Sequence, residues 1–397
     1  GDRGMSAAKA PRDSGIELGR VFCCYCVILI HLNAFYPALP WVSVVWSIAK
    51  CASTPVFFLI AGYFFNAEKP FSMYMGRIMA RVVIPTFCYM LLVAQLTPWL
   101  SGQGAFLDCL RGPNIGNYLR ALQILATTWP YKYVEGYNPF ISLWFTFALF
   151  LCYLCIPILK LVCQESASSR RLKVYIMWLG GLVFVVRVSL VCLFPNSYAM
   201  QHLDWWIEQK PFYWLWLMVL GHELNRVFRD RDLLGRIRAR LSLASLAAFV
   251  LGGVALYQLT MAFNVDLEGL SNQVFYAREF VIYFLAQLGM FVFFVTLDPG
   301  RGLLSRAILF VADKTFYIYV SHEAVYHKLL ALTGYDTDKL GDYMLASALT
   351  FLASLALGIV FKAIERKVAA ALGPRLSAFW GSLWARLSPG GKGRAAG

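Results

Sequence analysis

Long apolar runs, each about the length of a helix that crosses a bilayer, alternate with short polar segments along this chain of 397 residues. A transmembrane helix needs about 20 apolar residues, and these continuous runs lack the alternation of barrel strands. Ten runs qualify: Val21–Leu39, Val44–Phe65, Ile78–Trp99, Phe140–Leu161, Val174–Phe194, Phe212–Val227, Leu243–Phe263, Tyr276–Leu297, Thr315–Leu332 and Tyr343–Ile364. The pattern therefore predicts an all-α membrane protein with about ten transmembrane helices. A shorter run, Leu303–Ala312, is expected to be an interfacial helix leading into the ninth.

The ends of these runs predict three segments. Residues 1–16 are expected to be a disordered N-terminal leader, residues 17–366 the transmembrane domain, and residues 367–397 a cytoplasmic C-terminal tail. The tail ends in a Gly-rich stretch, 388–397, which is also expected to be disordered. The first run has the basic lead of a signal peptide, but no small-x-small cleavage site follows it and nine further runs do. It is therefore expected to be a retained helix.

Lysine and arginine lie mainly in alternate loops, which indicates how the chain is oriented in the membrane. If the N-terminus is cytoplasmic, 27 of the 36 basic residues fall on the cytoplasmic side. The opposite loops are rich in acids, namely Asp204, Glu208, Asp266, Glu268, Asp336, Asp338 and Asp342. Both termini are therefore expected to be cytoplasmic.

The composition excludes several classes of protein. Hydrophobic residues make up 59% of the chain and charged residues only 15%, against about 25% charged in soluble domains. These values exclude a disordered chain, a collagen-like fibre and an ordinary cytosolic enzyme. A net charge of +14 would suggest nucleic acid, but the basic residues lie between the apolar runs, so membrane topology explains it and no nucleic-acid partner is expected. No metal is expected either, because Cys152-x-x-Cys155 lies within a run without a second half-site and is interpreted as packing.

Ionisable residues inside the runs point to a functional site, because each costs about 2.5–3.5 kcal/mol to insert. His31 lies in the middle of the first run, ~16 Å of helix rise from Arg20 at the cytoplasmic edge. A lone buried histidine is more often a packing residue. However, Arg77 and Arg81 begin the third run at the same edge and share a helix face, so with Arg20 they form a possible phosphate clamp. Anchoring of the span by positive charge is the alternative role for Arg77.

The ninth run contains a second polar group: Tyr317, Tyr319, Ser321, His322, Glu323 and His327. Only Glu323 and His327 are spaced to share a helix face, which disfavours zinc. The group is interpreted as the lining of a polar cavity.

Five motifs occur in the order found in a known family. They are Glu17-x-x-Arg20 with His31, Thr54–Phe65 with Gly62-Tyr63, Arg77 and Arg81 with Pro85, Leu143-Trp144-Phe145, and Tyr319-x-x-His322 with a second histidine at His327. Through these motifs the chain resembles the acyltransferase-3 family of integral membrane acyltransferases, which includes O-antigen and enterobacterial common antigen acetylases. The pattern departs from the family at Ala61, usually Ser, and at Ser142, where a His often stands.

The resemblance implies transfer of an acyl group, with acetyl favoured, from cytoplasmic acyl-coenzyme A to a hydroxyl of a cell-envelope glycan or glycolipid in the bacterial cytoplasmic (inner) membrane. Histidine suits the role of base near neutral pH. The implied catalytic residues are His31 and Glu17. The implied donor-binding residues are Arg20, Arg77 and Arg81. The implied acceptor-binding residues are Trp144, Tyr319, His322 and His327.

The implied reaction also predicts how the substrates reach each other. A tunnel from Arg20 and Arg81 is expected to meet an opening from the outer loops near His31, with Tyr319 and His322 in its wall. Outer aromatic residues are expected either to stack on sugar rings or to form an interfacial belt. They are Trp129, Tyr131, Tyr133, Tyr137, Trp205 and Trp206.

Other functions stay open at the level of sequence. A transporter of a small polar solute would also have many spans with buried His and Arg, although no internal repeat of the kind found in transporters is evident. A signalling membrane protein has no specific support. For an enzyme, the acyl group, the acceptor and the oligomeric state are left open.

Overall fold

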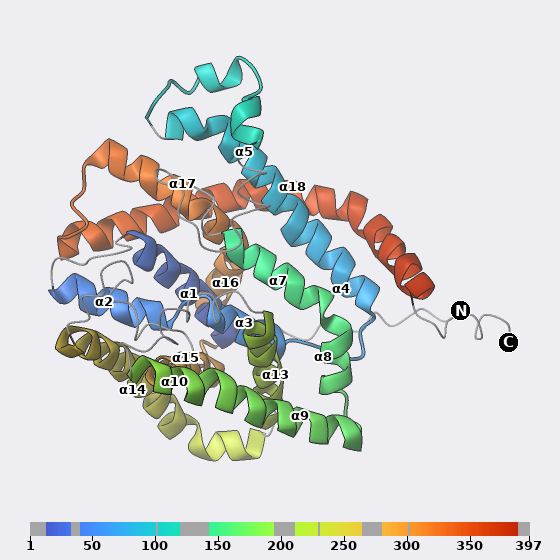
Figure 1. The fold of residues 1–397 in the computed structure, drawn as a ribbon. Helices are drawn as coiled ribbons and strands as arrows, with labels where there is room; N and C mark the ends of the chain where they lie inside the picture. Colours follow the sequence, from blue (N-terminus) through green and yellow to red (C-terminus); the bar gives the residue numbers. More distant parts are fainter. Residues whose placement is uncertain are drawn as a thin grey trace.

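The computed structural model describes residues 13–32, 40–100, 102–119, 143–193, 211–228, 231–263, 280–300 and 302–387. Regular structure within these ranges is helical, without strands, which confirms the predicted all-α class for this part of the chain (Figure 1).

The helices coincide with the predicted runs, although several runs are divided. The first run is α1 (Ser14–Leu32), and the second comprises α2 (Pro40–Cys51) and α3 (Pro55–Tyr63). The third comprises α4 (Phe71–Ile78), the π-helical η1 (Met79–Val83) and α5 (Ile84–Leu100), followed by the short η2 (Asp108–Leu110). The fourth is α7 (Trp144–Leu154) with α8 (Ile156–Cys163), and the fifth is α9 (Ala167–Gly180), π-helical η4 (Gly181–Val186) and α10 (Arg187–Leu193). The remaining helices are α13 (Pro211–Phe228), α14 (Arg231–Phe263), α15 (Val281–Thr296), α16 (Leu303–Ala312), α17 (Thr315–Thr333) and α18 (Leu340–Leu387).

Six helical segments in the described ranges are long and apolar enough to cross a membrane. They are Ser14–Leu32, Pro40–Tyr63, Phe71–Leu100, Ala167–Leu190, Gly235–Ala262 and Leu340–Arg386. The pair α7 and α8 meets at 61° and would form a seventh, broken span. Three helices that coincide with predicted spans, α13, α15 and α17, are not among these segments. The chain is thus a multi-pass membrane protein, and the number of ten crossings stays a prediction.

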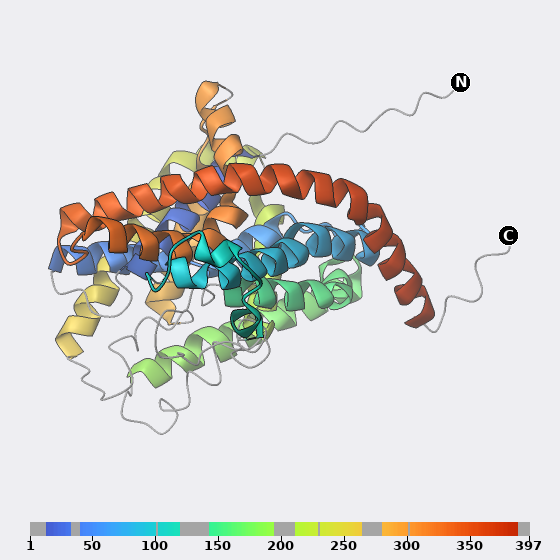
Figure 2. The ribbon, with the colours of Figure 1, turned by 90° about the horizontal axis from the view of Figure 1, so that it is seen from above.

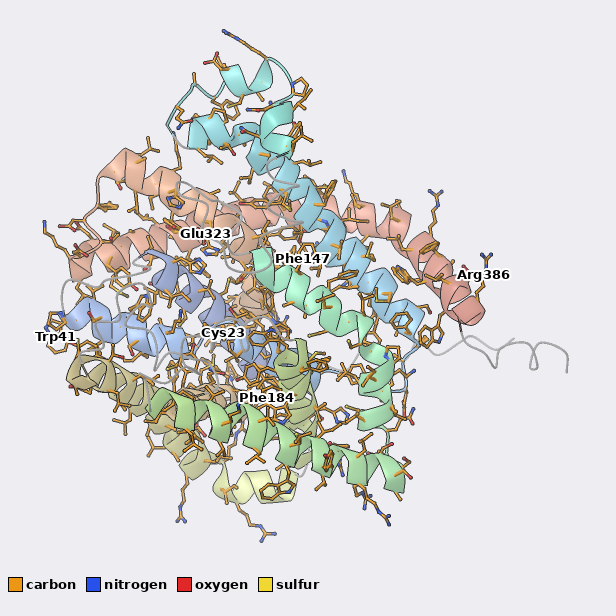
Figure 3. The ribbon with its side chains drawn as sticks, viewed as in Figure 1. Cys23, Trp41, Phe147, Phe184, Glu323 and Arg386 are labelled. Atoms are coloured by element: carbon orange, nitrogen blue, oxygen red, sulfur yellow. The ribbon has the colours of Figure 1, made fainter. Side chains whose placement is uncertain are left out.

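Helix α1 lies inside the bundle, where it contacts α2, α3 and α15 to α18 (Figures 1 and 2). Asp13 fixes the start of α1, because its Oδ1 accepts hydrogen bonds from the backbone N–H groups of Gly15 at 3.0 Å and Ile16 at 3.2 Å. Burial raises the pKa of the Asp13 carboxyl. Cys23 of α1 and Glu323 of α17 lie within the bundle, whereas Trp41 and Arg386 project from its edge (Figure 3). Helix α1 can therefore hold ionisable side chains away from lipid.

Helix α18 is much longer than the predicted tenth span. It continues to Leu387 along one face of the bundle and bends away near its end (Figure 2). The ring of Phe71 on α4 lies 6.3 Å from that of Trp380 and 4.9 Å from that of Trp384. These contacts give residues 367–387 a packing partner. The predicted segment boundaries at 366/367 and 16/17 fall inside α18 and α1, respectively.

Candidate active site

Two histidines and a glutamate meet between α1 and α17. His31 Nδ1 lies 2.5 Å from Glu323 Oε1 and 2.8 Å from His322 Nε2. The side chains of His322 and Glu323 are buried, while that of His31 is 24% exposed. Two buried polar groups of α17 therefore converge on one partly exposed histidine of α1.

Hydrogen-bond partners assign the proton on each ring. His322 Nδ1 lies 2.5 Å from the Tyr319 carbonyl oxygen, which can only accept, so Nδ1 donates and Nε2 carries the lone pair. His31 Nδ1 faces that lone pair and the Glu323 carboxylate, so it carries a proton. The basic atom of neutral His31 is consequently Nε2. A carboxylate that holds a histidine in this tautomer also stabilises the imidazolium, as the aspartate of a serine protease triad does.

Other predicted site residues border this group. His327 Nε2 lies 3.9 Å from Glu323 Oε2, one turn further along α17. The ring of Tyr319 lies 5.8 Å from that of His322 and 5.1 Å from that of Phe145. The side chain of Trp144, at the start of α7, lies outside the described residues. So do the outer aromatic residues Trp129, Tyr131, Tyr133, Tyr137, Trp205 and Trp206, and the acids Asp204, Glu208, Asp266 and Glu268.

The same three side chains are a possible ligand set for a metal ion, since one donor atom from each lies within 4.8 Å of the others. Tetrahedral zinc binds N and O ligands at ~2.0–2.2 Å, which places neighbouring ligands about 3.3 Å apart. The separations of 2.5 and 2.8 Å are those of hydrogen bonds instead. We therefore interpret His31, His322 and Glu323 as a hydrogen-bonded group.

Glu17 does not join the group, although it was predicted to act with His31. Its Oε2 lies 3.0 Å from Arg20 Nη1, and the fourteen residues from Glu17 to His31 correspond to a rise of ~21 Å along α1. Glu17 therefore positions Arg20, and Glu323 is the carboxylate beside His31. The sequence did contain a signal for Glu323: an acid in the apolar ninth run, next to His322, is costly to insert and therefore indicates a functional role.

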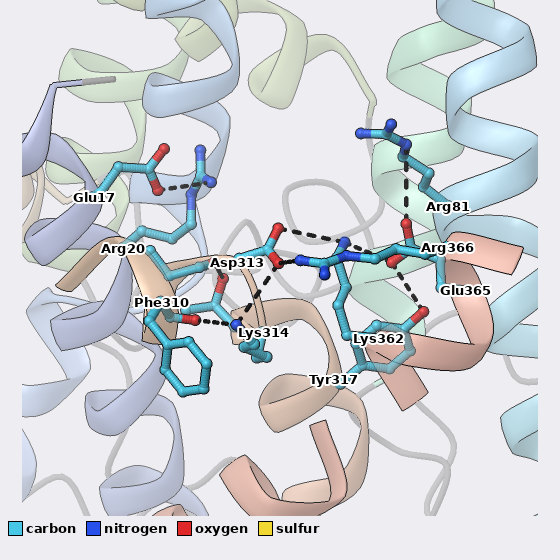
Figure 4. Close-up of polar contacts among 12 residues, drawn as sticks. Glu17, Arg20, Arg81, Phe310, Asp313, Lys314, Tyr317, Lys362, Glu365 and Arg366 are labelled. Atoms are coloured by element: carbon cyan, nitrogen blue, oxygen red, sulfur yellow. Dashed lines mark hydrogen bonds and ion pairs between the residues drawn. The ribbon is translucent and has the colours of Figure 1, made fainter. Parts of the chain in front are cut away.

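Charged side chains gather near the cytoplasmic ends predicted for α1, α17 and α18 (Figure 4). We call the cations the basic cluster: Arg20, Arg81, Lys314, Lys362 and Arg366. The carboxylates among them are Glu17, Asp313 and Glu365. Arg20 and Arg81 were predicted from the sequence, whereas Lys314, Lys362, Arg366 and their carboxylate partners were missed.

Glu365 contacts side chains of three different helical segments. It is buried, and its Oε2 accepts hydrogen bonds from Lys362 Nζ at 2.6 Å and from the Tyr317 hydroxyl at 3.1 Å. Its Oε1 lies 3.9 Å from Arg81 Nε. Glu365 thus links η1, α17 and α18, and it fixes two cations of the basic cluster.

Asp313, between α16 and α17, holds the other side of the basic cluster. Its Oδ2 lies 3.0 Å from Arg366 Nη2, and its Oδ1 lies 3.6 Å from Lys362 Nζ. The neighbouring Lys314 is buried and donates from Nζ to the Phe310 carbonyl oxygen at 2.6 Å. Burial lowers the pKa of the Lys314 ammonium.

Arg77 and Arg81, which the sequence predicted to share a helix face, differ in their surroundings. Arg81 lies in η1, where the Ile84 N–H donates to the Met79 carbonyl five residues earlier. Pro85 has no N–H to offer the Arg81 carbonyl, and this wider turn accommodates it. Arg81 Nε lies 3.9 Å from Glu365 Oε1, while Arg77 is exposed on α4 and forms no ion pair within the described ranges.

A family model described as an acyltransferase domain matches residues 13–363. The chain belongs to the acyltransferase-3 family. No curated protein and no solved structure has significant similarity to it. The match confirms the family that the motifs indicated, and it covers α1 and α17 with the His31, His322 and Glu323 group. The matched region of this acyltransferase ends within α18, after Lys362 and before Glu365.

Proposed function

We propose that this membrane acyltransferase moves an acyl group, acetyl in the first instance, from cytoplasmic acyl-coenzyme A to a hydroxyl of a cell-envelope glycan or glycolipid. One observation carries the proposal. The Glu323 carboxylate lies 2.5 Å from His31 Nδ1 and leaves Nε2 as a base, and Arg20 of the basic cluster lies ~16 Å below it along the same helix.

In the proposed reaction, His31 Nε2 takes the proton of the acceptor hydroxyl as its oxygen attacks the thioester carbonyl. Glu323 stabilises the imidazolium that forms. The carbon–sulfur bond then breaks, and the proton on Nε2 passes to the leaving thiolate. The products are the acyl ester, free coenzyme A and neutral His31, so one histidine serves as both base and acid.

The basic cluster supports a donor with phosphate groups. Arg20 and Arg81 would bind the diphosphate through charge-assisted hydrogen bonds, and the pantetheine arm would extend along α1 toward His31. Arg77, which is exposed on α4, would steer the donor from solution. Tyr319, His327 and the start of α7 at Trp144 are proposed to meet the acceptor.

The proposed location is the bacterial cytoplasmic membrane, with ten crossings and both termini in the cytoplasm. The distribution of lysine and arginine in the sequence supports this orientation. A transporter without acyl-transfer chemistry is the other candidate.

The decisive experiment supplies purified protein with acetyl-coenzyme A and an envelope glycan fraction. Release of the coenzyme A thiol and acylation of the glycan are measured together. His31→Ala is expected to fold and to lower turnover by ~10²-fold or more, which is the usual loss when a general base is removed. His222→Ala is the matched control, because His222 also lies beside a glutamate, Glu223 at 3.3 Å, but on α13.

Near-normal turnover in folded His31→Ala would reject His31 as the base. Failure of the wild-type protein to release thiol with any acyl-coenzyme A would favour the transporter.

A further inference from the structure

Two cations of the basic cluster come from the last helix and have no assigned role. Lys362 and Arg366 are four residues apart on α18 and therefore lie on one face of the helix. Asp313 contacts both, since its Oδ1 lies 3.6 Å from Lys362 Nζ and its Oδ2 lies 3.0 Å from Arg366 Nη2. The corner between α16 and α17 thus holds the two cations together (Figure 4).

Arg366 is open to a further partner. Its side chain is 68% exposed, against 61% for Arg81, 26% for Arg20 and 15% for Lys362. A guanidinium has five N–H donors, and the contact with Asp313 is made through Nη2. The remaining donors suit the tetrahedral oxygens of a phosphate, which arginine binds in a fixed fork.

The charges of the region favour an anion. The basic cluster has five cations and three carboxylates, so basic side chains outnumber acidic ones in the region as a whole. A phosphate monoester has a charge close to −2 at neutral pH, whereas each phosphate of a diphosphate linkage has only one. The monoester is therefore the most highly charged group of the donor, and the exposed Arg366 guanidinium can pair with it.

We propose that Lys362 and Arg366 form a subsite for the phosphate monoester on the ribose of coenzyme A, apart from the arginines that bind its diphosphate. This inference rests on the proposed function, because it assumes that acyl-coenzyme A is the donor. The ribose phosphate is at the end of the donor that is remote from the thioester, so the most exposed cation of the basic cluster is the one placed to meet it. Asp313 is a positioning residue that orients the Arg366 guanidinium.

The test is a comparison of coenzyme A with dephospho-coenzyme A, which lacks only the ribose phosphate. Affinities are measured by calorimetry on the full-length protein in detergent. The wild type is expected to bind coenzyme A about tenfold or more tightly than dephospho-coenzyme A. Arg366→Gln should lower the affinity for coenzyme A to nearly that for dephospho-coenzyme A, without changing the affinity for the latter.

Lys367→Gln is the matched control, because Lys367 is the next residue of α18 and is also exposed. It should keep the wild-type preference. Lys362→Gln gives a second reading of the subsite, and its preference should also fall.

Three results would overturn the subsite and leave the proposed function standing. The first is equal binding of the two ligands by the wild type. The second is an unchanged preference in Arg366→Gln, which is expected if these cations hold a lipid headgroup or only join helices. The third is an equal loss of affinity for both ligands. If the wild type binds neither ligand, the proposed donor is rejected, and the subsite with it.

Discussion

At the scale of single residues, the position of Glu323 supports the proposed role of His31 as the base. The carboxylate and His322 Nε2 are both acceptors, and both face His31 Nδ1 at 2.5 and 2.8 Å. Only the His31 tautomer with the proton on Nδ1 forms favourable hydrogen bonds here, and in this tautomer Nε2 has the free lone pair. The inserted charge of Glu323 therefore has a chemical role in the proposed reaction.

Glu323→Gln tests this role. The amide keeps the shape of the side chain but loses the charge that stabilises the His31 imidazolium, so kcat is expected to fall by ~10²-fold or more. The KM for acyl-coenzyme A should stay unchanged, because the basic cluster is intact. Steady-state kinetics with varied donor separates the two parameters. Glu223→Gln is the control, because Glu223 is also paired, with Lys173 Nζ at 2.7 Å, but elsewhere in the bundle. A normal kcat in Glu323→Gln would show that its charge is not used.

Arg81 and Arg77 make a second test at this scale. Arg81 lies beside Glu365 in the basic cluster, whereas Arg77 is exposed on α4. Arg81→Ala should weaken binding of coenzyme A by about 1.5 kcal/mol, the low end for charged hydrogen bonds because the side chain is 61% exposed. Arg77→Ala should weaken it much less, and mainly at low salt. Calorimetry at two salt concentrations distinguishes them, and equal losses would contradict the assignment.

The sequence predicted part of this site and missed part of it. His31, His322, Arg20 and Arg81 were found because each is a polar residue in or beside an apolar run. Glu323 was not paired with His31, because adjacent residues of a helix point ~100° apart and His322 already occupied the predicted wall. The structure resolves this, since His31 lies between the two directions and meets both side chains.

At the scale of helices, close packing depends on glycines that face a neighbouring backbone. Helices α3 and α13 pack together, and a Cβ at Gly62 would overlap the carbonyl of Met218. In the opposite direction, a Cβ at Gly221 would overlap the carbonyl of Leu59. Small residues at such positions allow membrane helices to approach closely. This contact supports the end of α3, which precedes the turn into α4 and Arg81.

Gly62→Ala is therefore expected to destabilise the protein by ~1–3 kcal/mol, the usual range for overpacking. The melting temperature in detergent, followed by tryptophan fluorescence, should fall. Gly181→Ala is the control, because a Cβ there meets no atom within 4 Å, and alanine suits a helix better than glycine does. If both variants melt like the wild type, α3 and α13 are not packed through Gly62.

The helices themselves were more predictable than their ends and irregularities. Where the structure describes them, the predicted apolar runs are largely helical, and the short run Leu303–Ala312 is α16 with the same bounds. The extension of α18 was missed because its stability comes from contact with α4 at Phe71, which no local pattern in 367–387 reveals. The turn at η1 was missed because helical spacing assumes a regular register, and Pro85 disturbs it.

At the scale of the whole molecule, the two functional regions lie on the same helices. Helices α1 and α17 both carry a residue of the active site and, one to three turns away, a residue of the charged region: Arg20 on α1 and Tyr317 on α17. In the proposed reaction, the phosphates and the thioester of the donor would therefore lie at different depths of the membrane. The side chain of His31 is 24% exposed, although α1 lies within the bundle.

This arrangement predicts transfer across the membrane. The donor would enter from the cytoplasm at Arg20 and Arg81, and the acceptor would reach His31 from the outer face, with Tyr319 and His322 in the wall where the two paths meet. Protein is reconstituted in sealed vesicles, its orientation is established by protease accessibility, and a glycan acceptor is enclosed. Acetyl-coenzyme A added outside should acylate the enclosed glycan only through molecules whose basic cluster faces outward.

The sidedness is checked with the same proteins. Arg81→Ala should reduce transfer at low donor concentration and recover at high concentration, because only donor binding is weakened. His31→Ala should lower transfer by ~10²-fold or more at every donor concentration, because the base is missing. Acylation that occurs only when detergent opens the vesicles, or only when donor and acceptor share a compartment, would refute the two-sided path. The donor is charged and cannot cross the bilayer. If ester forms on the enclosed glycan while the donor is present only outside, the acyl group must cross within the protein. Loss of this ester in His31→Ala would then connect the path to His31.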